Sequence, residues 1–211
     1  MQIMNRLAEL TEDWEYLTKR QGFRTSLPLI LVDIARLPYR HLRFKILARS
    51  LLDPFPVWQP KIRLSIRPFE LDDLDVVRQI DRPSEANLCA RRLDQGHRGL
   101  IAFFEGRPAG YSWGSTDTQT QLERVHLELD PGDVLCSDAF TAPAFRGQGI
   151  QTALTLARFH LFRYLGCRRA VSYIEVRNIP SLAVWERKFN SQRIGTIDFT
   201  RIGSWSRVRY T

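Results

Sequence analysis

Apolar and polar residues follow two different rhythms along most of this chain. In residues 61–67 an apolar side chain recurs at every second position, which is the spacing of a half-buried strand. Residues 69–80 and 84–95 have the pattern of helices, and Gly96 follows the second of them as a stop signal. The pattern therefore predicts a strand followed by two helices.

The rest of the chain continues this mixture. Two hairpins are predicted, because Gly and Pro gather at residues 106–108 and again at residues 130–133. The elements expected after Gly96 are strands 99–105 and 109–115, strands 122–129 and 134–141, helix 149–165, strand 170–176, helix 180–189, and strands 193–199 and 205–210. Strands that are joined partly by hairpins and partly by helices predict an α/β fold of the α+β type with a mixed sheet.

A proline-rich segment, residues 53–60, divides the chain. It holds three prolines in eight residues, and proline both removes a backbone donor and restricts the residue before it. Regular structure should therefore stop here. We expect a helical, basic amino-terminal extension with its linker at residues 1–60, and a main domain at residues 61–211.

The extension is predicted to hold a basic amphipathic helix. It has six basic residues and one acid between Arg24 and Arg49. Four apolar residues recur at helical spacing, namely Leu42, Ile46, Leu47 and Leu51. Such a helix either lies on an anionic membrane surface or packs on the main domain with its arginines outward, and the sequence leaves both open.

The chain as a whole is basic, with a net charge of +8 and a pI of about 9.9. That balance favours polyanionic partners, such as a membrane surface, nucleic acid or a phosphate-rich cofactor. No segment combines aromatic and basic residues in the manner of a nucleic-acid module, so nucleic acid is not expected as a partner. The hydrophobic fraction of 44% is sufficient for a sizeable core.

The three cysteines, at positions 89, 136 and 167, lie far apart and show no spacing typical of a zinc site. We therefore expect no metal. Isolated cysteines are typical of a reducing setting, and the first residues lack the apolar core of a signal peptide. These features predict a cytoplasmic protein, with attachment to the membrane periphery as a further option.

The sharpest local motif is Arg146-Gly147-Gln148-Gly149-Ile150-Gln151, which lies between a predicted strand and a predicted helix. A helix amino terminus offers free N–H groups and a partial positive charge, both of which favour a phosphate. The glycines let the backbone approach an anion, and Arg146 adds a cation. The spacing is that of neither a dinucleotide fold nor a P-loop. Taken alone, the motif fits a phosphate loop and a ligand-free helix start equally well.

In the order of its motifs, the region from residue 61 to residue 205 resembles the GNAT superfamily of acyl-CoA N-acyltransferases. Pro143, Arg146 and Gly149 match the turn and loop of that family. Further matches lie downstream, at Asn178, Ser181, Lys188 and Ile194-Gly195. Two positions depart from the family pattern, because Gln151 stands where Gly or Ala is usual and Asn190 where Gly is frequent. The resemblance implies a mixed, splayed sheet with helices on both faces.

The resemblance also implies a function, the transfer of an acetyl or longer acyl group from acyl-CoA to the primary amine of a small molecule. Acyl-CoA, as co-substrate, would lie where strands 134–141 and 170–176 splay apart. The residues that the resemblance assigns to cofactor binding are Phe140, Thr141, Arg146, Gly147, Gln148, Gly149, Ile150, Gln151, Asn178 and Trp185.

Two catalytic roles remain to be filled. The family often has a tyrosine acid seven residues after the position of Asn178, where this chain has Trp185, whose indole is not a usable acid. Tyr173 is the candidate in its place, with Tyr164 or water as alternatives. Asp138 is the first candidate for a base, because an acid within a buried strand calls for a reason, and an ion pair with an arginine is the alternative.

Other functions stay open at this point. The chain could bind acyl-CoA as a sensor without turnover, since Gln151 and Trp185 depart from the family. Segment 158–193 has eight basic residues and two acids, which fits the phosphate of CoA, an acyl carrier protein, an anionic membrane, or a solvated surface. The sequence names neither the amine nor the acyl length.

Overall fold

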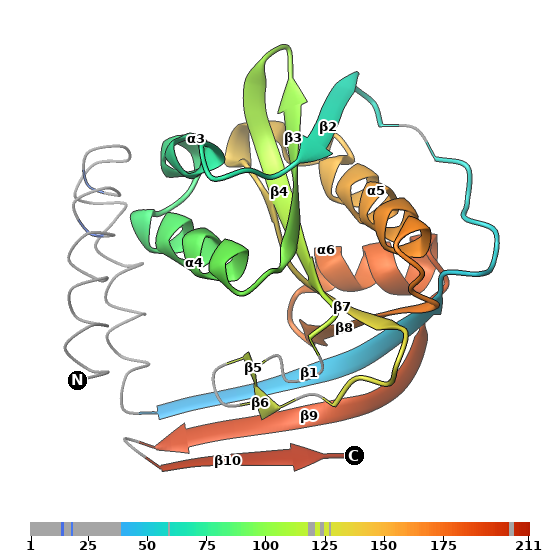
Figure 1. Cartoon of the computed structure of the whole chain (residues 1–211). Coiled ribbons are helices and arrows are strands. Elements are labelled where there is room, and N and C mark those ends of the chain that lie inside the picture. Colours follow the sequence, from blue (N-terminus) through green and yellow to red (C-terminus); the bar gives the residue numbers. More distant parts are fainter. Residues whose placement is uncertain are drawn as a thin grey trace.

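The structure is a computed structural model, and it describes residues 39–58, 60–117, 121–122, 125–126, 128–202 and 205–211, together with Trp14 and Thr18. Eight strands form one sheet in the order β10-β9-β1-β8-β7-β4-β3-β2 (Figure 1). They are β1 (Tyr39–Ser50), β2 (Leu64–Pro68), β3 (Arg98–Phe104), β4 (Arg107–Ser115), β7 (Asp133–Thr141), β8 (Arg169–Glu175), β9 (Gln192–Ile202) and β10 (Trp205–Tyr210). Neighbouring strands are antiparallel except for β7 and β8, so the predicted mixed sheet is confirmed.

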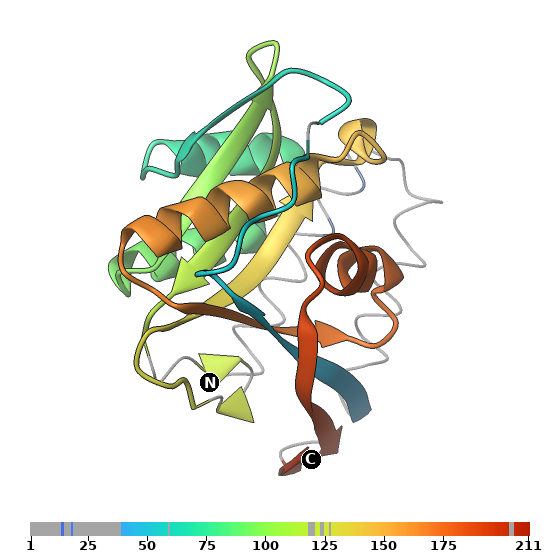
Figure 2. The same ribbon diagram turned by 90° about the vertical axis from the view of Figure 1, so that its right-hand side faces the viewer.

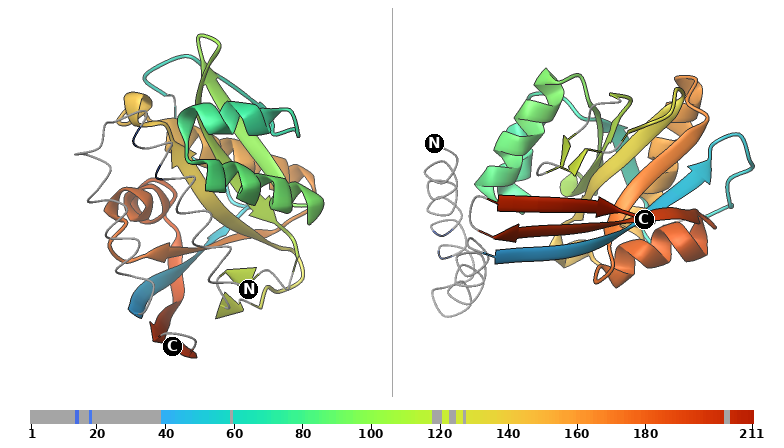
Figure 3. Two further views of the ribbon diagram at one scale, coloured as in Figure 1. Left: turned by 90° about the vertical axis from the view of Figure 1, so that its left-hand side faces the viewer. Right: turned by 90° about the horizontal axis from the view of Figure 1, so that it is seen from below.

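Helices cover both faces of this sheet. They are α3 (Asp73–Ile80), α4 (Pro83–Asp94), α5 (Ile150–Tyr164) and the short α6 (Ile179–Leu182), which continues into a π-helical turn, η2 (Ala183–Lys188). Helices α3 and α4 pack on one face of β3 and β4, and α5 packs on the opposite face (Figures 1 and 3). On the side of α5, η2 shares a core with β1, β7 and β8. The layered α+β arrangement agrees with the fold expected from the sequence.

The prediction of a helix at residues 42–51 is wrong, because all of this segment except its last residue belongs to β1. The strand lies inside the sheet, antiparallel to β8 on one side and to β9 on the other (Figure 3). Leu42 and Ile46 are four residues apart, which fits a helix and a strand alike, but Phe44 between them gives the alternation of a strand. These side chains pack on one face of β1, while Leu47 is buried on the other.

The proline-rich segment is therefore not the edge of the folded domain, since β1 precedes it and lies within the sheet. Apart from Trp14 and Thr18, the remainder of the predicted extension lies outside the described residues.

One of the two predicted hairpins is present. Strands β3 and β4 pair around Glu105 and Gly106, which both have positive φ angles, 49° and 73°. A two-residue turn of this kind matches the twist of the strands it joins. The second hairpin is wrong, because β5 (Gln121–Leu122) and β6 (Val125–His126) pair with each other and not with β7.

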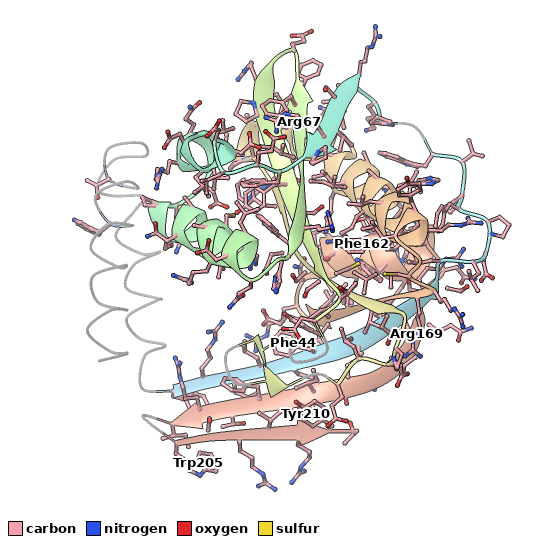
Figure 4. The ribbon with its side chains drawn as sticks, viewed as in Figure 1. Phe44, Arg67, Phe162, Arg169, Trp205 and Tyr210 are labelled. Carbon is pink, nitrogen blue, oxygen red and sulfur yellow. The ribbon has the colours of Figure 1, made fainter. Side chains whose placement is uncertain are left out.

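The splay of the sheet lies between β7 and β8. These parallel strands pair only at their first residues, from Asp133 with Arg169 to Leu135 with Val171, and then separate. Arg169, labelled in Figure 4, donates two hydrogen bonds of 2.8 and 2.7 Å to the buried carboxylate of Asp133. This bidentate ion pair joins β7 and β8 at the end where the two strands still pair. The predicted separation of the two strands is thus confirmed.

Candidate active site

Within the described residues, no strand pairs along residues 136–141 with the edge of β7 that faces the splay. On its other edge β7 pairs with β4 from Leu135 to Thr141. An unpaired edge offers backbone N–H and C=O groups in the spacing of a strand, and an extended ligand with amide groups can add to it.

A β-bulge lies in the middle of this edge. Tyr111 of β4 pairs with Phe140, and Trp113 pairs with Ser137, so two residues of β7 face the single Ser112. The first of the two, Asp138, has a left-handed backbone with φ of 43°. A bulge bends the strand and turns its backbone groups to new directions, which is why bulges recur at active sites.

Two buried arginines hold the bulge from opposite faces of the sheet. Arg92 of α4 forms an ion pair with the carboxylate of Asp138. Arg158 of α5 donates hydrogen bonds of 2.7 Å to the carbonyl of Trp113 and 3.1 Å to the carbonyl of Ser137. A left-handed aspartate costs about 1–3 kcal/mol and persists only where its surroundings hold it. The ion pair that the sequence left as the alternative for Asp138 is therefore present.

Three titratable groups on the α4 side of the bulge stay neutral. Burial raises the pKa of Tyr111 far above its ordinary value, and its hydroxyl donates to Asp81 at 2.8 Å. Burial likewise raises the pKa of Cys89 to about 12. Burial, and then the nearby charge of Arg92, lowers the pKa of His97. A buried thiol and phenol of this kind supply neither a nucleophile nor a ready base.

The predicted phosphate loop lies at the amino terminus of α5, one short turn beyond the end of β7. Its two glycines have positive φ angles, 79° at Gly147 and 87° at Gly149. Among the described residues, no backbone acceptor pairs with the N–H groups of residues 147–152. A Cβ at Gly147 would meet nothing within 4 Å. Free donors, open space and the positive end of a helix fit a phosphate group.

Gln151, one of the two departures from the family pattern, does not fill the loop. Its amide Nε2 donates to Ser181 Oγ at 3.1 Å, so the side chain turns toward α6. Asn178 caps α6 by accepting a hydrogen bond of 3.3 Å from the N–H of Ser181. The second departure, Asn190, has a left-handed backbone with φ of 48°, a conformation that asparagine adopts more readily than most residues other than glycine.

A family model described as the acetyltransferase (GNAT) family matches residues 63–190 of this chain. The chain belongs to the GNAT acetyltransferase family. The match spans more than half of the chain and contains the phosphate loop, the bulge and both strands of the splay.

Two solved structures share the GNAT fold of this chain. One is a protein from Drosophila, 12% identical, with a TM-score of 0.55; the match covers 86% of this chain and 58% of that one. The other is a GCN5-related N-acetyltransferase from Sphaerobacter thermophilus, 16% identical, with a TM-score of 0.54, covering 84% and 55%. The chain thus spans little more than half the length of either protein. A comparison with curated proteins found no match.

The structure separates the candidate GNAT site residues into two groups. Phe140 and Thr141 lie at the end of β7, and the loop from Arg146 to Gln151 follows them in the chain, up to the first turn of α5. Arg146 is exposed, and its Nε donates to the carbonyl of Thr141 at 3.4 Å. Trp185, by contrast, is only 2% exposed and packs edge-to-face on Phe159, 5.4 Å away. Its assignment to cofactor binding is corrected, since the indole is part of the core.

Tyr173 lies on β8 two residues beyond the last pair with β7. Its ring is half-buried and packs edge-to-face on Phe44, with the ring centroids 5.8 Å apart. It therefore lies on the part of β8 that is separated from β7, and not at the position of Trp185, where the family often has its acid.

Sequence reasoning missed Arg92, Arg158 and Trp58. The sequence predicts that Arg158 belongs to a basic segment, but its side chain is fully buried. The sequence predicts a linker at Trp58, but this residue contacts the phosphate loop at Gly149. The sequence does not predict the contact between Trp58 and Gly149, because the two residues lie about ninety positions apart in the chain.

Within the described residues, no helix is long and apolar enough to cross a membrane. Nor do three His, Cys, Asp or Glu side chains come together there in a way that would hold a metal ion.

Proposed function

We propose that this protein transfers an acetyl or longer acyl group from acyl-CoA to the primary amine of a small molecule. The observation that carries the proposal is the continuity of two sites. The unpaired edge of β7 ends at Thr141, and the free N–H groups of the phosphate loop follow after one short turn. A ligand with an extended, amide-bearing arm and a diphosphate fits both, and CoA has this composition.

Each part of the site then has a role. Acyl-CoA supplies an activated acyl group as a thioester. The loop N–H groups and Arg146 bind the diphosphate, and the edge of β7 pairs with the amides of the pantetheine arm. The bulge at Asp138 turns backbone N–H groups toward the thioester carbonyl, where they stabilise the charge that develops on its oxygen.

The amine must lose a proton and the sulfur must gain one as the C–S bond breaks and the C–N bond forms. We assign the second transfer to Tyr173, whose hydroxyl would protonate the leaving sulfur. Asp138 is less suited to the first, because its carboxylate is already bound to Arg92. We therefore assign Asp138 a positioning role in the bulge.

Replacing Tyr173 with phenylalanine is expected to lower the turnover number roughly tenfold, because a thiolate is already a tolerable leaving group near neutral pH. Phenylalanine keeps the edge-to-face packing on Phe44. Steady-state kinetics should show an unchanged KM for acyl-CoA. An unchanged turnover number would show that water protonates the sulfur.

The proposed function is tested by thiol release. The chain is mixed with acetyl-CoA or a longer acyl-CoA and a panel of small amines, and free CoA is measured with a thiol-reactive dye. We expect release that depends on the amine. Tight binding of acyl-CoA without release on any amine would instead identify a sensor, and absence of binding would rule out both functions.

A pair of glycine variants serves as the control. Gly147 and Gly96 have nearly equal φ angles, 79° and 75°, and a Cβ at either would meet nothing within 4 Å. The backbone strain of an alanine is therefore matched. We expect Gly147→Ala to weaken acyl-CoA binding, because its methyl group enters the phosphate loop, whereas Gly96→Ala should bind as the unchanged chain does.

Docking on an acyl carrier protein or an anionic membrane through segment 158–193 stays a prediction. The charge available for it is smaller than the sequence indicates. Arg158 is buried, and Arg169 is bound to Asp130 and Asp133.

A further inference from the structure

The segment between β1 and β2 runs along the outer side of α5. We call residues 51–58 and 60–61 the strap. Figure 2 shows it passing over α5 on its way from β1 to β2. Phe55 packs on His160, with ring centroids 4.8 Å apart, near the carboxyl end of α5. Lys61 N–H donates to the carbonyl of Gln148 at 3.3 Å, just before the amino end. The strap therefore spans the helix from end to end.

Trp58 is the point where the strap meets the phosphate loop. A Cβ built on Gly149 would lie 2.4 Å from Cζ2 and 2.5 Å from Cη2 of the indole. The edge of the indole thus rests directly on the Cα of the residue that precedes α5, and only glycine leaves room for it. The preceding residue, Val57, is 98% exposed. The strap therefore directs Trp58, and not Val57, onto the loop.

The indole also faces a lysine. The Nζ of Lys188 lies 5.2 Å from the ring centroid of Trp58, which is within the range of a cation–π interaction. The same Nζ donates to Oγ1 of Thr152, in the first turn of α5, at 2.8 Å. Lys188 comes from η2, so the ammonium group bridges η2, the strap and the helix start.

The position of the Lys188 ammonium group is electrostatically unfavourable. The amino end of a helix carries a partial positive charge, so a cation beside it is repelled. Among the described residues, no carboxylate forms an ion pair with Lys188 to offset this, and its neighbour Glu186 is bound to Lys45. The contacts hold a positive charge against a positive helix end, and an anionic ligand would remove the conflict.

We propose that Trp58 is a positioning residue of the cofactor site, which holds Lys188 over the first turn of α5 so that its ammonium binds a phosphate of CoA. The inference rests on the proposed function, since it takes CoA as the ligand. It adds to the site a residue from the strap, outside the region that the family model matches. The phosphate is either part of the diphosphate or the 3′-phosphate, and both offer the same chemistry.

The test measures binding of the full chain by calorimetry with CoA, dephospho-CoA and pantetheine. Lys188→Met should weaken CoA binding about tenfold, which corresponds to about 1.4 kcal/mol for one charge-assisted contact. Trp58→Leu should weaken it roughly fivefold, since a cation–π contact contributes about 1 kcal/mol. Pantetheine, which lacks phosphates, should bind all variants alike. Val57→Ala is the matched control and should leave every affinity unchanged.

The decisive result is the double variant. If Trp58 acts through Lys188, Trp58→Leu should cost nothing further in a chain that already carries Lys188→Met. Additive losses, or an equal loss with pantetheine, would overturn the proposal, as would tighter binding of CoA by Trp58→Leu. The loss from Lys188→Met identifies the phosphate: it vanishes with dephospho-CoA if the 3′-phosphate is bound, and persists if the diphosphate is.

A variant that does not fold and a chain that does not bind CoA have different consequences. If Trp58→Leu does not fold, Trp58→Phe replaces it, with a smaller loss that must also vanish beside Lys188→Met. If the unchanged chain binds pantetheine and CoA equally or binds neither, the proposed function itself fails, whatever the variants do.

Discussion

Replacing Leu47 with alanine is expected to lower the free energy of unfolding by about 2–5 kcal/mol, the usual cost of removing a buried leucine side chain. Leu47 lies in β1 and is 0% exposed. It packs in the core that joins β1 with β7, β8, α5 and η2. The alanine would leave a cavity at the centre of this core, where strands on both sides of β1 restrict collapse.

The control for this prediction is Leu52, five residues later. It is 62% exposed, so Leu52→Ala should change stability by less than about 0.5 kcal/mol. Urea unfolding followed by circular dichroism measures both variants, with the midpoint and slope compared. Equal effects at the two positions would mean that β1 is not part of the core. The same result would restore the separate amino-terminal extension that the sequence predicts.

The contrast at β1 shows where sequence reasoning failed. Leu42 and Ile46 satisfy the four-residue spacing of a helix, but they also satisfy the two-residue spacing of a strand. Local pattern could not choose between them, because the choice depends on β8 and β9, which lie more than a hundred residues later. Tertiary pairing overrides a local preference in such cases.

Features that depend on a few neighbouring residues could be predicted from the sequence. The positive φ angles of Gly147, Gly149 and Asn190 follow from residue type and from neighbouring motifs. The same holds for the start of α5 and for the hairpin of β3 and β4. The arginines around the bulge had no such signal. Arg92 meets Asp138 across 46 positions, and Arg158 meets Trp113 across 45.

The contacts of the strap could not be predicted from the sequence either. Three prolines predict a segment without regular structure, and the described residues between β1 and β2 have none. Proline content does not indicate what such a segment covers. Only the structure brings Trp58 to Gly149 and Lys188, so the interpretation as a linker missed a contact with the phosphate loop.

Replacing Asp138 with asparagine is expected to lower the turnover number about 100-fold, because a displacement of about 1 Å at the reacting centre has a cost of this size. Asparagine tolerates the left-handed backbone at this position and has nearly the same shape, so the change removes only the charge that pairs with Arg92. The dissociation constant of acyl-CoA should change by no more than about twofold, since the phosphate loop is untouched.

The matched control for this change is Asp75→Asn. Asp75 also forms an ion pair with an arginine, Arg78, but its side chain is 84% exposed and lies on α3. An exposed pair of this kind contributes at most about 1 kcal/mol and has no contact with the bulge. Steady-state kinetics of this variant should therefore match those of the unchanged chain.

The pH dependence of turnover decides between positioning and base catalysis at Asp138. A base gives the pH–rate profile an acidic limb, which Asp138→Asn would abolish. A residue that only positions the bulge leaves the shape of the profile unchanged and lowers it at every pH. Arg92→Met gives the reciprocal test. It should reduce turnover as strongly as Asp138→Asn does, because each removes the same ion pair. If Asp138 were the base, Arg92→Met would keep the acidic limb, whereas Asp138→Asn would abolish it.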